Sequence, residues 1–397
     1  MKILFLSPTL PYPLTDGGRI RVFNLLKQIA ENNDVTLLAL ETQPTDAESV
    51  LCIENLDIKV HLVPNSPTLP RVSLNTLLSA FFKRQPITVA RYNVPAYREK
   101  LRELLSAETF DIVHYEMFHT AQFYSETDLP RVLSQQNVDS AIWRRLQAET
   151  SNLFYKFAYW TQQLAFQRYE RVISPKFDAV TCTSDIDATV FQEHCAEGTV
   201  SVIPNGVDVT HYRPDFTSEE PAHLIYIGSM DWYPNEDAVS FFAEEVLPQI
   251  QNRVPDVKFS IVGGNPSARV QKLGDKEGVV VTGRVPEIKP YFAGATVFVV
   301  PLRIGSGTRL KILEALAMGK AVVSTTVGAE GLALRDGEEI FIADEPKTFA
   351  DAVTRLLTDR SLRQKIGQDG RARVEQDYDW RNIGKKLLAV YESVIEK

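Results

Sequence analysis

The stretch PLRIGSGTRLKILEALAMG, residues 301–319, directly follows the apolar run ATVFVV at 295–300. An apolar run rich in β-branched residues is typical of a buried strand in a parallel sheet. In the helix that the later residues predict, Ile312 and Leu316 share the apolar face, and Gly319 is placed to end it. The stretch therefore predicts a strand, a glycine loop and a helix in succession.

The glycine loop has the features of a phosphate-binding site. Gly305 and Gly307 would let backbone N–H groups approach an anion, and the positive end of the helix dipole favours the same charge. Arg309 and Lys311 add mobile positive charge. Glu314 lies one turn further along, where a carboxylate can accept two hydrogen bonds from a ribose diol. These residue types together predict a nucleotide site.

The composition limits the class of protein. A chain of 397 residues is long enough for two domains. The formal charge of −8 argues against a nucleic-acid binder, because affinity for the phosphate backbone needs a basic surface. The three cysteines lack metal-ligand spacing, which is typical of a reducing cytosol. No run approaches the roughly 20 apolar residues that cross a bilayer. We therefore expect a cytoplasmic protein, soluble or peripheral at the inner face of the cell membrane.

Strand-like runs alternate with helical segments in both halves of the chain, which predicts an α/β fold with parallel sheets. The connector IPNGVD at 203–208 contains a Pro-Asn-Gly turn, and we place the domain boundary there. The expected strands cover 2–7, 34–40, 58–63, 110–116, 131–134 and 177–183 in the first half, and 224–227, 258–262, 279–281, 295–300 and 321–325 in the second.

The wording GTRLKILE at 307–314 resembles the donor-binding signature of the large retaining glycosyltransferase family four, in particular a branch from bacterial exopolysaccharide clusters, including those associated with PEP-CTERM sorting systems. The segment 200–208 is similar to the family's interdomain connector. The resemblance implies the GT-B fold, with two Rossmann-like, doubly wound parallel-sheet domains facing each other across a cleft. It implies an acceptor-side domain at 1–203, a donor-binding domain at 204–380, and a last helix at 381–397 that packs back on the first domain.

Family members carry two glutamates, with seven residues between them, around this loop and helix start. Glu314 stands at the second position, whose role in the family is to hold the ribose. Ser306 stands at the first, where the family glutamate contacts the transferred sugar and stabilises charge near the anomeric carbon. The resemblance therefore assigns Arg309 and Lys311 part of the phosphate binding, and the catalytic candidates are Glu116, Ser306, Arg309 and Lys311.

The predicted strand at 110–116 ends in Glu116, and strand ends in open parallel sheets point into the ligand crevice. The family often has an Asp-x-x-His-x-His pattern here, and the sequence DIVHYE at 111–116 places Glu116 at the second histidine position. We therefore expect Glu116 to contact the sugar or an acceptor hydroxyl; the alternative is a helix-capping or solvated glutamate. His114 lies two residues deeper and is predicted to be structural. The amides at 135–137 could read sugar hydroxyls or close a loop.

The other donor-binding candidates lie at further turns and strand ends. By resemblance, the glycine pair at 17–18 faces the donor across the cleft, and the segment at 283–285 lines the base pocket. The family's usual Arg and Lys after the strand at 224–227 are missing here, where Gly228 follows. The predicted donor-binding set is Gly17, Gly18, Gly228, Gly283, Arg284, Val285, Gly305, Gly307, Thr308, Arg309, Lys311 and Glu314.

Residues 140–173 are rich in aromatic and basic side chains and are predicted to be helical, and 71–105 are also basic. The favoured interpretation is that the aromatic residues pack on the core of the first domain while the charges are solvated. The alternative is that this face lies on an anionic membrane surface, where a lipid-linked acceptor would be found.

The predicted function is transfer of a sugar, with retention, from a nucleotide-diphosphate-sugar to a glycan or lipid-linked acceptor, in cell-surface or exopolysaccharide synthesis. The resemblance implies no metal and no cofactor beyond the donor substrate. An epimerase or hydrolase of nucleotide-sugars, and a non-catalytic nucleotide-sugar-binding protein, remain alternatives. A dehydrogenase is disfavoured, because no Gly-x-Gly-x-x-Gly follows the first strand.

Overall fold

The computed structural model describes residues 1–42, 45–64, 80, 85–305 and 307–396. Ser306 and most of 71–84 therefore lie outside the described residues. The chain divides into two compact units. Unit 1 comprises Met1–Pro204 and Ile383–Lys397, and unit 2 comprises Asn205–Asn382.

The described part of unit 1 has a seven-stranded sheet in the order β3-β2-β1-β4-β5-β6-β7, and every pairing is parallel. Its inner strands are mostly buried, as a sheet covered on both faces requires, whereas the edge strands β3 and β7 are only partly buried. The strands are β1 (Lys2–Ser7), β2 (Asp34–Glu41), β3 (Ile58–Pro64), β4 (Ile112–Glu116), β5 (Arg131–Ser134), β6 (Ala179–Cys182) and β7 (Val200–Val202).

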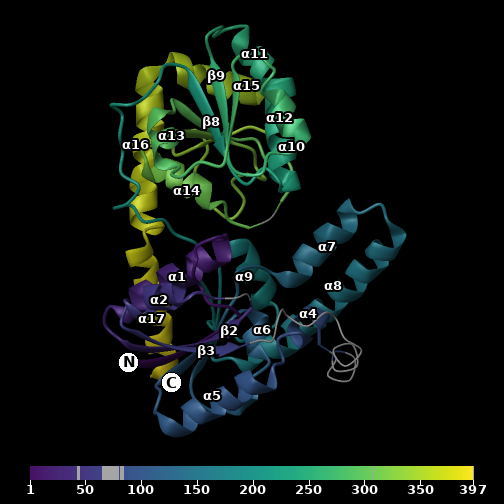
Figure 1. Cartoon of the computed structure of the whole chain (residues 1–397), viewed down its shortest axis with the longest axis vertical. Coiled ribbons are helices and arrows are strands. Elements are labelled where there is room, and N and C mark those ends of the chain that lie inside the picture. Colours follow the sequence, from purple (N-terminus) through teal and green to yellow (C-terminus); the bar gives the residue numbers. More distant parts are fainter. Residues whose placement is uncertain (43–44, 65–79, 81–84, 306, 397) are drawn as a thin grey trace. The chain divides into compact units, whose positions relative to one another are not determined.

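Helices flank this sheet, and the pair α7 and α8 extends away from it (Figure 1). The last helix of the chain belongs to unit 1 from Ile383 onward. The helices are α1 (Gly17–Ala30), α2 (Ala47–Glu54), α4 (Ile87–Ala90), α5 (Pro95–Ala107), α6 (Met117–Ala121), α7 (Asp139–Glu149), α8 (Leu153–Ile173), α9 (Asp185–Gln192) and α17 (Trp380–Ile395), with short 3₁₀ turns at η1 (Tyr124–Glu126) and η2 (Ser174–Lys176).

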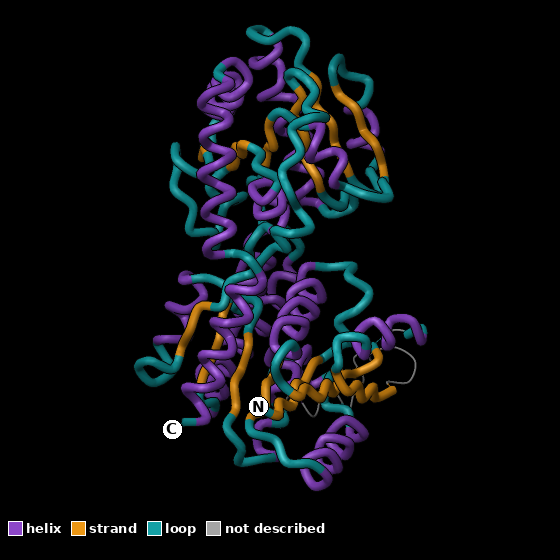
Figure 2. Tube along the Cα trace, turned by 90° about the vertical axis from the view of Figure 1, so that its left-hand side faces the viewer, coloured by secondary structure: helices purple, strands orange, loops and turns teal. Residues whose placement is uncertain are grey.

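Unit 2 repeats the architecture with a six-stranded parallel sheet among its described residues, in the order β10-β9-β8-β11-β12-β13. Strands and surrounding helices are distinguished in Figure 2. The elements are β8 (His223–Ile227), α10 (Tyr233–Phe241), η3 (Phe242–Val246), α11 (Leu247–Gln251), β9 (Lys258–Val262), α12 (Ala268–Leu273), β10 (Val279–Gly283), α13 (Lys289–Gly294), β11 (Val297–Val300), α14 (Leu310–Ala317), β12 (Ala321–Ser324), β13 (Phe341–Ile342), α15 (Pro346–Thr358) and α16 (Arg360–Asp377).

The predicted fold class is confirmed: both units are doubly wound α/β sheets. In each sheet the strand order reverses once, between β1 and β4 in unit 1 and between β8 and β11 in unit 2. At such a point the loops after the two adjacent strands diverge to opposite faces and open a crevice at the carboxyl edge, which is where ligands bind in this architecture.

The favoured interpretation of residues 140–173 is only half right. Phe166, Tyr169 and Ile173 at the base of α8 are buried, as expected. Further out along the helix, the apolar side chains are exposed, including Phe154 at 76 % and Phe157 at 63 %. The reason is geometric, because that part of α8 extends beyond the sheet and, among the described residues, packs mainly along α7 (Figure 1).

Candidate functional site

The glycine loop of unit 2 leaves the sheet at its reversal point. It follows β11, and Gly228 follows the adjacent strand β8. Gly305 and Gly307 have φ values of +135° and +79°, which side-chain-bearing residues rarely adopt. The Arg309 guanidinium lies so close to Gly305 that a Cβ at that position could not fit beside it. The loop therefore needs its glycines both for its conformation and for the position of Arg309.

Lys311 extends from the first turn of α14 to the end of β8. Its Nζ donates to the Tyr226 hydroxyl at 3.0 Å and to Asn235 Oδ1 at 3.5 Å, and it lies 4.3 Å from the centroid of the Tyr226 ring. A Cβ at Gly228 would lie 2.9 Å from this Nζ. Burial lowers the pKa of the ammonium to about 7, and the charge of Arg309 acts in the same direction. Lys311 is thus a cation held in a site without enough negative charge to stabilise it.

Glu314 lies one helical turn beyond Lys311 and accepts a hydrogen bond from the Tyr212 hydroxyl at 3.1 Å. Burial raises the pKa of the Glu314 carboxyl, while the Tyr212 hydrogen bond and the Lys311 charge lower it. Tyr212 comes from the segment after the connector, and no sequence motif pointed to it. Among the described residues, no hydrogen bond occupies the second carboxylate oxygen of Glu314, so it is available for a ligand hydroxyl.

The remaining donor-binding candidates of unit 2 lie at the same edge of the sheet. Gly283 ends β10 with φ +69°, and its carbonyl accepts from the Gly263 amide at 3.2 Å. The Arg284 side chain lies over Gly264, and Val285 packs against the core. The Thr308 hydroxyl is buried with no hydrogen-bond partner among the described residues. Within those residues no hydrogen bond joins Arg284 to Lys311 or Glu314, so the structure places these candidates on one edge without linking them directly.

Unit 1 has a cavity of about 460 Å³ at its own reversal point. The loops after β1 and β4 and the start of α1 form most of its wall. Its lining residues are Ser7, Pro8, Thr9, Pro11, Asp16, Gly18, Arg19, Val22, Thr42, Tyr92, Glu116, Met117 and Gln136. The predicted residues Gly18 and Glu116, from segments far apart in the sequence, therefore meet at one cavity.

Glu116 is completely buried, and it makes no capping hydrogen bond to α6. Its two carboxylate oxygens accept from His114 Nε2 at 3.1 Å and from Gln136 Nε2 at 2.8 Å. The alternative of a helix-capping or solvated glutamate is therefore wrong. The partly exposed Gln136, one of the amides singled out in the sequence, is the member of this group that can reach a ligand in the cavity.

A buried network extends from Glu116 to the last helix. His114 stacks on Phe5 at a centroid distance of 4.0 Å, and its Nδ1 lies 2.7 Å from the Tyr391 hydroxyl. Burial lowers the pKa of His114, which favours the neutral imidazole. A neutral ring that donates from Nε2 to Glu116 can accept from Tyr391 at Nδ1. The buried Arg21 donates to the Ile203 carbonyl at 2.7 Å. Its guanidinium also interacts electrostatically with the Glu116 carboxylate.

The glycine pair at the start of α1 fits closely against this network. α1 begins at Gly17, and its N-cap Asp16 accepts from the Arg19 amide at 2.9 Å. A Cβ at Gly18 would lie 2.8 Å from Gln136 Oε1, closer than real side chains come. Met117, directly after Glu116, has φ +63°, a strained value for a residue with a side chain. Strain and close approach therefore both occur at the wall of the cavity.

The described residues also bear on metal binding and membrane spanning. Across the described ranges, no three His, Cys, Asp or Glu side chains gather closely enough to hold a metal ion. In the same part of the chain, no helix combines the length and hydropathy of a membrane span.

Comparison with known families matches both units. A family model described as "Glycosyltransferase Family 4" matches residues 15–211, and one described as "Glycosyl transferases group 1" matches residues 221–359. The first match includes β2 to β7 of unit 1 and the second includes β8 to β13 of unit 2, whereas β1 and α17 lie outside both matched ranges.

Individual relatives match over most of their length. An uncharacterized 44.6 kDa protein in the cps region of Klebsiella pneumoniae is 22 % identical, over 98 % of this chain and 99 % of that protein. Phosphatidyl-myo-inositol mannosyltransferase of Mycolicibacterium smegmatis is 26 % identical, over 83 % of this chain and 84 % of the mannosyltransferase. The crystal structure of Anabaena HepE in complex with UDP and glucose has a TM-score of 0.68 at 16 % identity, covering 99 % of this chain and 100 % of HepE.

Proposed function

Because the chain is a family 4-like glycosyltransferase with the GT-B fold, we propose that it transfers a sugar from a nucleotide-diphosphate-sugar to a glycan or lipid-linked acceptor. The proposal assigns the donor nucleotide to unit 2 and the acceptor side to unit 1. It further assigns the protein to cell-surface polysaccharide synthesis. The relative encoded in a cps region supports this assignment.

The observation that carries the proposal is the position of Lys311. Its amine is held by Tyr226 and Asn235 at the reversal point of the sheet, beside a glycine loop and the start of α14. A diphosphate placed there would stabilise the ammonium that burial now disfavours. Arg309 and the first amides of α14 would share the negative charge, and Glu314 would accept hydrogen bonds from the ribose.

This arrangement would also stabilise the diphosphate as the leaving group. When the bond between sugar and diphosphate breaks, negative charge develops on the phosphate oxygens, and preorganised cations stabilise it. Lys311 and Arg309 would do this without a divalent metal. We propose that the sugar is transferred with retention, by attack of the acceptor on the face from which the diphosphate departs.

For the acceptor side, we propose that Gln136 contacts the sugar or an acceptor hydroxyl, and that Glu116 fixes the direction of the Gln136 amide. The amide N–H donates to Glu116, and its oxygen lies over Gly18. Two relatives indicate the classes of ligand to test: one is named for a phosphatidyl-myo-inositol acceptor, and the other is bound to UDP and glucose.

The test is a calorimetric and thermal-shift screen of UDP, GDP, ADP and their sugar conjugates, with and without Mg²⁺, alongside NAD and NADP. We expect one nucleoside diphosphate and its sugar conjugate to bind. Each should bind with the same affinity in the presence and in the absence of Mg²⁺. Mass spectrometry with that donor and extracted lipid-linked glycans should then show transfer of one sugar. Donor turnover without any acceptor would instead identify an epimerase or hydrolase, and binding without turnover would identify a non-catalytic protein.

A further inference from the structure

The outward face of α8 carries a continuous stripe of exposed side chains. Its members follow helical spacing of three and four residues, so they lie on one face of the helix. We call this set the α8 stripe; it consists of Leu153, Phe157, Trp160, Leu164, Arg168 and Arg171. The opposite face at the base of the helix, with Phe166 and Tyr169, is buried in the core of unit 1.

The α8 stripe changes in chemistry along its length. Its outer part is apolar and exposed, with Leu153 at 81 %, Phe157 at 63 % and Trp160 at 43 %. Neighbouring side chains extend this surface, because Phe154 is also exposed. A contiguous apolar surface of this kind is uncommon on a monomer and marks a site of contact with another surface.

The inner part of the stripe is basic and borders a cavity of about 830 Å³ between α7, α8 and α9. Arg144, Arg168 and Arg171 line this cavity. Among the described residues, none of these three guanidinium groups forms an ion pair. The carboxylate of Glu170 accepts from the Ser140 amide at 2.9 Å, and Glu193 is the other acidic residue of the lining. The cavity is therefore suited to phosphate groups.

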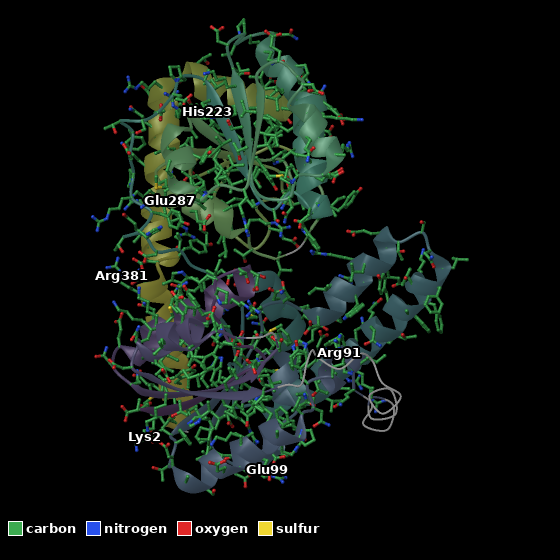
Figure 3. The ribbon with its side chains drawn as sticks, viewed as in Figure 1. Lys2, Arg91, Glu99, His223, Glu287 and Arg381 are labelled. Carbon is green, nitrogen blue, oxygen red and sulfur yellow. The ribbon has the colours of Figure 1, made fainter. Side chains whose placement is uncertain are left out.

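The local charge is opposite to that of the chain. The protein carries a formal charge of −8, which would repel it from an anionic surface. The exposed charges on the α7 and α8 pair are mostly basic, namely Arg144, Lys156, Arg168 and Arg171, against the exposed Glu149. The outer part of this pair extends away from the sheet, with side chains reaching into solvent (Figure 3). The apolar outer part and the basic inner part thus follow one another along the same face of α8.

We propose that the α8 stripe docks the protein on an anionic lipid membrane. The apolar outer residues enter the interface between headgroups and acyl chains, where aromatic side chains are favoured. Arg168 and Arg171, with Arg144, bind the phosphates of the lipid headgroups. This inference rests on the proposed function, because a lipid-linked acceptor is the reason for a transferase to bind a membrane. The docking itself is measured without donor or acceptor.

The test is co-sedimentation of the full chain with phosphatidylcholine vesicles, with and without about 30 % phosphatidylglycerol, at low and high salt. We expect binding to the anionic vesicles that weakens as salt rises. Phe157→Ser/Trp160→Ser should lower the partition coefficient by about tenfold or more, because two interfacial side chains are lost. Arg168→Ala/Arg171→Ala should lower it roughly 25-fold on anionic vesicles, since each basic residue near such a surface contributes about 1 kcal/mol.

Matched controls remove similar groups from elsewhere on unit 1. Leu51→Ser replaces an apolar side chain that is 52 % exposed on α2, and Lys385→Ala/Lys386→Ala removes two exposed charges from α17. Both should bind vesicles as the parent protein does. Equal losses in the controls, or no preference of the parent for anionic vesicles, would overturn the proposal. A dimer in light scattering that Phe157→Ser/Trp160→Ser dissociates would also overturn it, by assigning the stripe to a second copy of the chain.

Nucleotide binding separates this inference from the proposed function. Each variant is titrated with the nucleoside diphosphate identified for the parent protein. Loss of vesicle binding with unchanged nucleotide affinity supports the docking proposal. Vesicle binding by a parent protein that binds no nucleotide would leave the docking surface standing and remove the proposed transferase.

Discussion

The sites of units 1 and 2 occupy the same place in the same architecture, yet they are built in opposite ways. In unit 2 the site is local: Gly305, Arg309, Lys311 and Glu314 come from one loop and the helix that follows it. In unit 1 the polar groups come from distant parts of the chain. The last of them, Tyr391, is 277 residues from its partner His114.

The second difference is in how polar groups are satisfied. In unit 1, Glu116 and His114 find all their partners inside the protein and have no exposed surface. In unit 2, the hydrogen-bond partners of Lys311 among the described residues are neutral, and burial keeps its pKa near 7. A network whose hydrogen bonds are all made inside the protein fixes the positions of its side chains. A buried cation without a nearby counter-charge is stabilised when an anionic ligand binds. The comparison therefore predicts that unit 2 variants lose binding and unit 1 variants lose rate.

The largest expected effect is that of Arg309→Ala/Lys311→Ala. Hydrogen bonds to charged groups contribute about 1.5–3 kcal/mol each, so affinity for the nucleoside diphosphate should fall roughly 100-fold or more. The measurement is isothermal calorimetry with the diphosphate found in the screen. Lys272→Ala/Lys276→Ala removes two exposed charges from the same unit and should leave affinity unchanged. An unaltered affinity in the first variant would dismiss the phosphate site.

The next effect tests the close packing around Lys311. In Gly228→Ala the new Cβ would lie 2.8 Å from Asn235 Nδ2 and 2.9 Å from Lys311 Nζ, so both groups must move. Because displacement of a charged ligand group by a few tenths of an ångström weakens its hydrogen bonds, we expect diphosphate affinity to fall by about tenfold. Gly198→Ala is the control, because a Cβ at Gly198 would meet no neighbouring atom. Its φ of +77° strains the backbone, so this variant should lose stability but keep its affinity for the diphosphate.

A smaller effect is expected in unit 1 from Tyr391→Phe. The substitution removes the hydroxyl near His114 and loosens the orientation of Glu116 and Gln136, so we expect kcat to fall by roughly three- to tenfold. The KM for the donor should stay the same, because Tyr391 is a positioning residue far along the network. Tyr97→Phe is the matched control, since it removes another buried hydroxyl of unit 1 that donates to the Leu38 carbonyl at 2.9 Å. Equal loss of kcat in both variants would reduce Tyr391 to a stabilising role.

The contrast between the two sites also explains what could be predicted from the sequence. The strands followed from runs such as residues 258–262, which are predicted and observed with the same bounds. The fold class followed from their alternation with helices. The loop of unit 2 could be found because glycines, cations and a carboxylate stand close together in the sequence, and contiguous residues keep their spacing in the structure.

The network of unit 1 could not be found in this way. Glu116 was singled out from its strand end, but its complete burial depends on Gln136 and on a helix at the other end of the chain. Tyr212 beside Glu314 escaped prediction for the same reason. The aromatic residues of α8 were misjudged because helical periodicity shows which side chains share a face, and tertiary structure decides whether that face is covered.

The prediction most specific to the contrast between the two sites is the pH dependence of donor binding. With a pKa of about 7 in the free protein, Lys311 is mostly protonated at pH 6 and mostly neutral at pH 8. A bound diphosphate raises this pKa, so binding takes up a proton above pH 7 and affinity falls as pH rises. Below about pH 6 the amine is charged in both states, and affinity is nearly constant.

We therefore expect affinity for the nucleotide-sugar to fall roughly 15-fold between pH 7 and pH 8.5, because the fraction of protonated Lys311 falls by that factor. A nucleotide-sugar is the right probe, since its diphosphate keeps one charge state over this range. Calorimetry in buffers of different ionisation enthalpy should show uptake of close to one proton at pH 8. Lys311→Arg keeps its charge throughout and should bind with no pH dependence, so a flat profile for the parent protein would show that Lys311 is already charged before the donor arrives.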